Sequence, residues 1–154
     1  MPLLKFAHDT FSPAVEEAQE EVTLDAWLEN PHAHAGATIL VINNDEDLFD
    51  LRCDFAGFSV IVLDFPSFAD GRAYSQARLL RERYGFRGEI RARGDILRDQ
   101  LFFMVRCGID GFEMDTGDAA TANDAFSEFS FAYQRAADKG EPIWRMRLQS
   151  AKAA

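Results

Sequence analysis

The feature that most constrains the fold is the segment Val60–Met114, in which three strand patterns alternate with two helix patterns. The strand patterns are short runs rich in β-branched residues, and the helix patterns repeat apolar residues at intervals of three and four. Including an earlier run, four strands are predicted to start near Thr38, Phe58, Glu89 and Asp110. Because crossovers between such strands are right-handed, the strands should be parallel. The sequence therefore predicts an α/β fold of about four parallel βα units, arranged like half of a TIM barrel or as a small open parallel sheet.

The chain of 154 residues is expected to form a single α/β domain. We expect three parts: an N-terminal segment of helix and loop (1–35), a βα core (36–137) and a terminal strand (138–154). Ser12 followed by Pro13 is typical of a helix start. The turn at Asn43 predicts a short helix through Leu51, and the alternation over Ile143–Leu148 predicts an edge strand.

Composition argues against several classes of function. No apolar run approaches the ~20 residues of a membrane span, and no secretion signal is visible. Cys53 and Cys107 fit neither a disulfide framework nor a metal site, and a net charge of −10 argues against a nucleic-acid partner. No nucleotide, flavin or iron–sulfur motif is present. We therefore expect a cytoplasmic protein with no metal and no bound cofactor.

Positive charge is concentrated in one part of this acidic chain. The residues from Asp70 to Arg106 include nine arginines, no lysine and five acidic residues, a net charge of +4. The planar guanidinium group binds carboxylate, phosphate or sulfate through paired hydrogen bonds. This segment is therefore the expected site for a small anionic ligand.

Polar residues follow the predicted strands, where parallel sheets bind ligands. The strand exits at Asp64, Asp95 and Asp115 should share one edge. The candidate ligand-binding residues are Asp70, Arg72, Ser75, Arg91 and Arg93, and the candidate catalytic residues are Asp64, Tyr74 and Asp95. The arginines would hold an oxyanion, the carboxylates would orient them or accept protons, and Tyr74 would donate a proton. A structural interpretation stays open, in which Asp70 and Asp95 cap helices and the strand arginines form internal ion pairs.

Two runs in this segment carry a family resemblance: DGRAYSQARLLRER (Asp70–Arg83) and GEIRARGDILRDQL (Gly88–Leu101). The region Asp64–Met114 resembles the bacterial domain-of-unknown-function family 934. Genes of that family commonly lie beside those for assimilatory sulfite reductase, and its members are often labelled as oxidoreductases involved in sulfite reduction. The resemblance implies a role in sulfur assimilation and supplies no established catalytic residue.

Two functions are compatible with these observations. The first is an accessory protein of assimilatory sulfite or sulfate reduction that binds a small oxyanion or an anionic nucleotide at the strand edge. The alternative is a non-catalytic adaptor that binds an acidic partner, such as a sulfite reductase component, through the helix arginines Arg78, Arg81 and Arg83. A small lyase or hydrolase with Asp95 as base is a third interpretation, and the sequence leaves open whether any reaction is catalysed. The apolar helix expected at Ile96–Cys107 predicts a homodimer.

Overall fold

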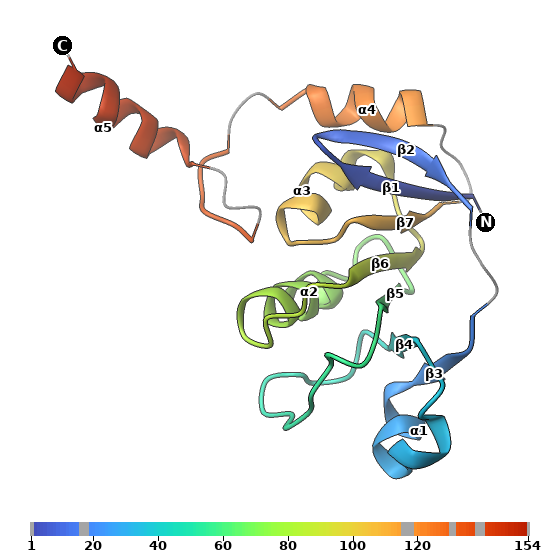
Figure 1. Cartoon of the computed structure of the whole chain (residues 1–154). Coiled ribbons are helices and arrows are strands. Elements are labelled where there is room, and N and C mark those ends of the chain that lie inside the picture. Colours follow the sequence, from blue (N-terminus) through green and yellow to red (C-terminus); the bar gives the residue numbers. More distant parts are fainter. Residues whose placement is uncertain (1, 16–18, 115–118, 130–131, 138–140, 154) are drawn as a thin grey trace.

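The computed structural model describes residues 2–15, 19–114, 119–129, 132–137 and 141–153 (Figure 1). Its fold is mixed α/β, with one seven-stranded, mostly parallel sheet. The strands are β1 (Leu3–Ala7), β2 (Thr10–Ala14), β3 (Glu21–Thr23), β4 (Ile39–Ile42), β5 (Val60–Phe65), β6 (Glu89–Gly94) and β7 (Gly111–Glu113). The helices are α1 (Leu24–Glu29), α2 (Arg72–Glu82), α3 (Leu101–Arg106), α4 (Ala119–Ser127) and α5 (Ile143–Ala153), with 3-10 turns η1 (Pro31–His34) and η2 (Arg98–Gln100).

The strands lie in the order β2-β1-β7-β6-β5-β4-β3. Neighbouring strands from β3 to β7 are parallel, and the β1–β2 hairpin adds two antiparallel strands beside β7. Strands β5 and β6 pair from Val60 with Glu89 to Phe65 with Gly94. The parallel pairing predicted for these two strands is therefore confirmed, and their carboxyl ends lie at the same edge.

The two faces of the sheet differ in chemistry. Helices α2 and α3 lie on one face (Figure 1), and its core side chains include Leu40, Ile42, Ile61, Leu63, Ile90, Ala92 and Phe112. Successive residues of a strand point to opposite faces. The other face therefore carries the buried Ile39, Val41, Val60 and Val62, together with charged residues of β6 and its neighbours.

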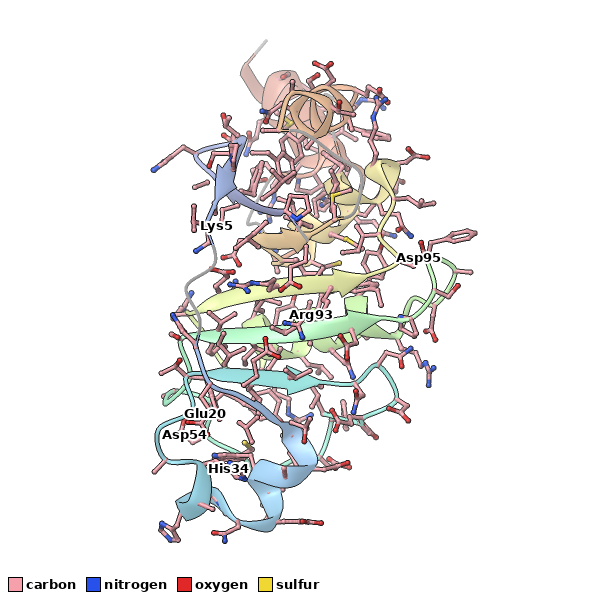
Figure 2. The ribbon with its side chains drawn as sticks, turned by 90° about the vertical axis from the view of Figure 1, so that its right-hand side faces the viewer. Lys5, Glu20, His34, Asp54, Arg93 and Asp95 are labelled. Carbon is pink, nitrogen blue, oxygen red and sulfur yellow. The ribbon has the colours of Figure 1, made fainter. Side chains whose placement is uncertain are left out.

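Ion pairs cross this second face, onto which Figure 2 looks. We call it the charged face; its paired residues are Lys5, Glu21, Glu89, Arg91, Arg93 and Glu113. Lys5 Nζ lies 2.7 Å from Glu89 Oε2, and Arg91 Nε donates to Glu89 Oε1 at 2.8 Å. Burial alone would raise the pKa of Glu89, but the hydrogen bonds from Lys5 and Arg91 outweigh it and hold the pKa below its ordinary value. Strand β6, on which charged and apolar residues alternate, lies between β7 and β5 and is a central strand of the sheet.

Three predicted elements are wrong. Ser12 and Pro13 lie in β2, where proline is tolerated because the strand is at the sheet edge, and the acidic residues 16–18 lie outside the described part of the chain. No helix forms over residues 43–51. The predicted terminal strand is the helix α5, in which Trp144 and Leu148 lie four residues apart on one side. Among the described residues, no helix is both long and apolar enough to cross a bilayer.

Candidate functional site

A row of polar residues crosses the carboxyl ends of the central strands. Asp64 of β5 pairs in register with Arg93 of β6, and Arg93 pairs with Glu113 of β7. Asn43 directly follows β4, whose last residue, Ile42, pairs with Leu63. Because residues of one row point to the same face, this row belongs to the charged face.

A pocket of about 220 Å³ opens beside this row. We call it the edge pocket; it is lined by Asn43, Asn44, Asp64, Phe65, Pro66, Arg93 and Gly94. The turn after β4 that supplies its two asparagines is held by the buried Gln76 of α2. Gln76 Nε2 donates to the backbone oxygens of Asn43 and Glu46, each at 2.8 Å. Helix α2 therefore fixes one wall of the edge pocket.

Arg93 supplies the positive charge of the edge pocket. It makes four hydrogen bonds, two to Glu113 and two to Glu21 of β3. These bonds use Nε, both N–H groups of Nη2 and one N–H of Nη1, so one N–H on Nη1 has no partner among the described residues. The hydrogen bonds to Glu21 and Glu113 raise the pKa of Arg93 further, and its side chain is 27% exposed. Arg93 is thus held in place by two carboxylates, and one of its N–H groups has no partner among the described residues.

Asp64 faces Arg93 across the same row. Its side chain is half-buried, and this burial raises the pKa of Asp64, an effect that Arg93 opposes and that Glu113 and Glu21 reinforce. A carboxyl group with a raised pKa takes up a proton more readily, and in its neutral form it donates a hydrogen bond. The edge pocket therefore combines one cation with one protonatable acid.

Asp70, Arg72 and Ser75 lie beside the edge pocket. Arg72 Nη2 donates to Asp70 Oδ2 at 2.7 Å, and Asp70 Oδ1 accepts from the backbone N–H of Arg72, the first residue of α2. The N-cap position itself is Gly71, so Asp70 lies one residue before the cap. Hydrogen bonds from Arg72 lower the pKa of Asp70 to about 2. Arg72 and Ser75 line a second pocket of about 240 Å³, which shares Asn44 with the edge pocket. Asn44 Nδ2 also donates to Asp70 Oδ2 at 2.7 Å, which links the two groups of residues.

Arg91 lies deeper on the charged face than Arg93. Only 4% of its surface is exposed, and it bonds to Glu89 and to Glu113. Gly111 of β7 leaves space for these side chains, because a Cβ there would lie 2.7 Å from Glu89 Oε1. Arg91 is therefore part of an internal ion-pair network and does not line the edge pocket.

Tyr74 and Asp95 lie outside the edge pocket. The ring of Tyr74 packs edge-on against Phe65 with centroids 5.5 Å apart, and burial raises the pKa of Tyr74 to about 12. Asp95 is exposed beyond the strand ends (Figure 2). Its Oδ2 accepts from the backbone N–H of Phe68 at 3.1 Å, which ties two loops together. Asp115, the third acid expected at this edge, lies outside the described residues.

Sequence reasoning did not single out Asn43, Asn44, Glu21 or Glu113. Asn43 and Asn44 follow a buried strand directly, and this position is a signal for a ligand site. The glutamates carry no comparable signal, because their importance comes from strand order. Among the described residues, no three His, Cys, Asp or Glu side chains are grouped in a way that could hold a metal ion.

The fold and the site define a mixed α/β protein with a polar pocket at the carboxyl edge of parallel strands. Residues 39–144 match the family model described as bacterial protein of unknown function (DUF934), and the chain belongs to this family. The matched region includes the whole edge pocket, whereas β1, β2 and β3 precede it. Comparisons with curated proteins and with solved structures gave no significant match.

Proposed function

We propose that this protein is an accessory protein of assimilatory sulfite or sulfate reduction that binds a small oxyanion in the edge pocket. The link to sulfur assimilation rests on the gene neighbourhood that the family resemblance implies. The ligand class rests on Arg93, which lines the edge pocket together with Asp64 and has one N–H without a partner among the described residues. The proposal assigns binding and not turnover, because Tyr74 and Asp95 lie outside the edge pocket.

The size and lining of the edge pocket favour a small oxyanion over a nucleotide. Pockets that enclose drug-sized ligands usually measure about 300–1,000 Å³, and the edge pocket measures about 220 Å³. Arg93 would contribute a charge-assisted hydrogen bond, and the side-chain amides of Asn43 and Asn44 lie beside it. Protonated Asp64 would donate to a ligand oxygen, whereas its carboxylate form would repel the anion.

The adaptor alternative receives less support from the contacts of the helix arginines. Arg78 bonds to Glu82 one turn away, and Arg81 is occupied by backbone oxygens and by Asp110. Arg83 lies over the ring of Phe49, 4.4 Å from its centroid. These interactions leave no row of unengaged arginines for an acidic partner.

As part of the same proposal, we interpret the parallel strands as half of a barrel. The ends of the sheet bend toward the charged face (Figure 1). Arg93 of β6 meets Glu21 of β3 at 2.6 Å, although β4 and β5 lie between the two strands. A flat sheet would separate β3 from β6 by roughly 14 Å, so curvature favours this contact.

Calorimetric titration with sulfate, sulfite and phosphate tests the binding proposal. Sulfate is the best probe of pH dependence, because its charge does not change between mildly acidic and mildly alkaline solution. Sulfate should bind more tightly as the pH falls through the raised pKa of Asp64, because the protonated acid no longer repels the anion. Asp64→Asn should bind sulfate equally tightly above and below the pKa of Asp64, since the amide is neutral throughout.

Variants of Arg93 and Arg78 complete the titration. Arg93→Gln should weaken sulfate binding by roughly 10- to 100-fold, the equivalent of one charge-assisted hydrogen bond. Arg78→Gln is the matched control, because Arg78 is exposed and pairs only with Glu82 among the described residues. Thermal melting of each variant separates lost binding from lost folding. If the wild-type protein binds none of the three anions, either above or below the pKa of Asp64, the proposal is wrong.

A further inference from the structure

Helix α5 projects away from the rest of the molecule (Figure 1). Its base is anchored, because the N–H of Ile143 donates to the carbonyl of Ala132 at 2.9 Å. Beyond this anchor, three large apolar side chains are exposed to solvent: Trp144 (42%), Met146 (40%) and Leu148 (56%). Trp144 and Leu148 share one side of α5, and Met146 lies nearly opposite to them.

The spacing of apolar residues on α5 places three of them along one side of the helix. Trp144, Leu148 and Ala151 lie four and three residues apart, so they form one stripe along the helix. An isolated helix of 11 residues is marginally stable in water, and most helices of this length are stabilised by packing of such a stripe. The stripe therefore indicates a surface on which α5 packs.

The net charge of α5 indicates which residues border the surface on which it packs. Helix α5 contains Arg145, Arg147 and Lys152 and no acidic residue, a net charge of +3 in a chain whose total is −10. A complementary partner is apolar and bordered by carboxylates. The rest of this chain, with a net charge of −13, meets the second condition.

The chain also exposes a suitable apolar surface, next to α3. We call it the aromatic surface; it consists of Phe68 (52% exposed), Leu97 (41%), Phe103 (49%) and Phe129 (43%). Gln100 joins its parts, because its amide donates to Phe68 O and its Oε1 accepts from Leu97 N. Phe103 follows Gln100 by three residues, and its ring lies 5.7 Å from that of Phe129. Asp95 and Asp99 lie beside these residues in the chain, and Arg98 between them pairs with Glu128, so the border carries more acidic than basic residues.

We propose that α5 of one molecule docks on the aromatic surface of a second copy, and that the second copy reciprocates. Helix α5 points away from its own sheet (Figure 1), so the surface it covers belongs to another molecule. Two identical contacts related by a twofold axis close the assembly at a dimer. This interface is separate from the edge pocket, and its existence does not depend on the proposed ligand.

Light scattering on the full-length protein at micromolar concentration tests the assembly. The wild-type protein should have the mass of a dimer. Trp144→Ala combined with Leu148→Ala should weaken dimerisation at least about tenfold, whereas Gln149→Ala, on another side of α5, should not. Circular dichroism and melting of each variant verify that the sheet domain stays folded. A monomeric wild-type protein, or a dimer indifferent to the double substitution, overturns the proposal and assigns α5 to a different partner or to none.

Charge reversal tests whether the receiving surface is on a second copy. Arg147→Glu and Asp99→Arg should each weaken the dimer, because each places like charges across both contacts. An equimolar mixture of the two variants should recover the dimer. In a mixed pair, the introduced glutamate meets the introduced arginine at one contact, and the original Arg147 and Asp99 meet at the other. Failure of the mixture to recover, when the apolar substitutions do disrupt the dimer, overturns the aromatic surface as the receptor.

Discussion

The geometry of the edge pocket depends on a single glycine at the end of β6. Gly94 has φ 118°, a conformation that residues with a side chain rarely adopt. A Cβ at this position would lie 2.3 Å from the carbonyl oxygen of Phe65, which already accepts the N–H of Asp95 at 2.8 Å. Any side chain would therefore push the end of β6 away from β5, and Arg93 would move away from Asp64.

Gly94→Ala should lower the free energy of unfolding by about 2–3 kcal/mol, because backbone strain and a steric clash add at this position. It should also weaken anion binding. Gly57→Ala is the control, because a Cβ at Gly57 meets no atom within 4 Å and its φ is not in the positive range. The free energy of unfolding of Gly57→Ala should stay within about 0.5 kcal/mol of that of the wild-type protein. Urea unfolding measures both variants, and equal midpoints for them would contradict this account.

At the same scale, the sequence identifies the arginines better than it identifies their partners. Arg91 and Arg93 stand out because they alternate with apolar residues on one strand. Their partners come from other strands, and Glu21 is 72 residues from Arg93 in the chain. Which carboxylates meet the arginines depends on strand order and sheet curvature, and local alternation carries neither.

At the scale of elements, Arg81 holds three parts of the fold together. From the last turn of α2, its Nε donates to Gly108 O at 2.9 Å and its Nη1 donates to Gly88 O at 2.7 Å. Its Nη2 donates to Asp110 at 3.0 Å, immediately before β7. The guanidinium thus joins the end of α2 to the starts of β6 and β7, so a residue first considered for partner binding has a structural role.

Arg81→Ala should lower the free energy of unfolding by about 3–4 kcal/mol, because it leaves Asp110 and several carbonyls without their donor. Arg81→Lys should recover only part of this loss, since an ammonium group lacks the planar fork. Arg78→Ala, on the same helix, should cost about 0.3–0.5 kcal/mol, as expected for an exposed pair one turn apart.

The decrease in unfolding free energy caused by Arg81→Ala should also depend on pH. Burial raises the pKa of Asp110, and Arg81 opposes that shift. Without the arginine, the folded protein should take up a proton at Asp110 at a higher pH. The deficit of Arg81→Ala relative to the wild-type protein should therefore shrink as the pH falls. Urea titrations at several pH values measure it, and a deficit that grows toward low pH would contradict this role.

The elements differ in how well local sequence predicts them. Strands β4 and β5 and helix α2 are confirmed, because a strand buried on both faces and a helix with one apolar face leave strong local patterns. Local sequence predicts a strand in place of α5, because Trp144, Met146 and Leu148 also fit a period of two. Local sequence does not predict the β1–β2 hairpin, because Ser12 followed by Pro13 is typical of a helix start. Proline is acceptable in β2 because this strand lies at the sheet edge.

At the scale of the whole molecule, most arginines of the positive segment are engaged in contacts with the rest of the fold. Its strand arginines meet Glu21 and Glu113, which lie outside the segment, and its helix arginines meet carboxylates, carbonyls or a ring. Arg81, Arg91 and Arg93 are thus held within the fold, whereas Arg72, Arg78, Arg83 and Arg98 pair with neighbours at the surface. At the edge pocket, Arg93 lies with Asp64 and two asparagines, and one N–H of Arg93 has no partner among the described residues.

The proposed function predicts a growth phenotype in the bacterium. A strain that lacks the gene should grow poorly on sulfate or sulfite as the sole sulfur source and normally on cysteine, as expected for an accessory protein of sulfite reduction. Complementation by Arg78→Gln should restore growth, whereas complementation by Arg93→Gln should not, because Arg93 lines the edge pocket and Arg78 does not. Asp64→Asn should restore growth if the carboxyl group serves binding, since the amide keeps a neutral hydrogen-bond donor in its place. Normal growth of the deletion strain on sulfate, with no second copy of the gene present, would refute the assignment to sulfur assimilation and leave anion binding as a separate property of the edge pocket.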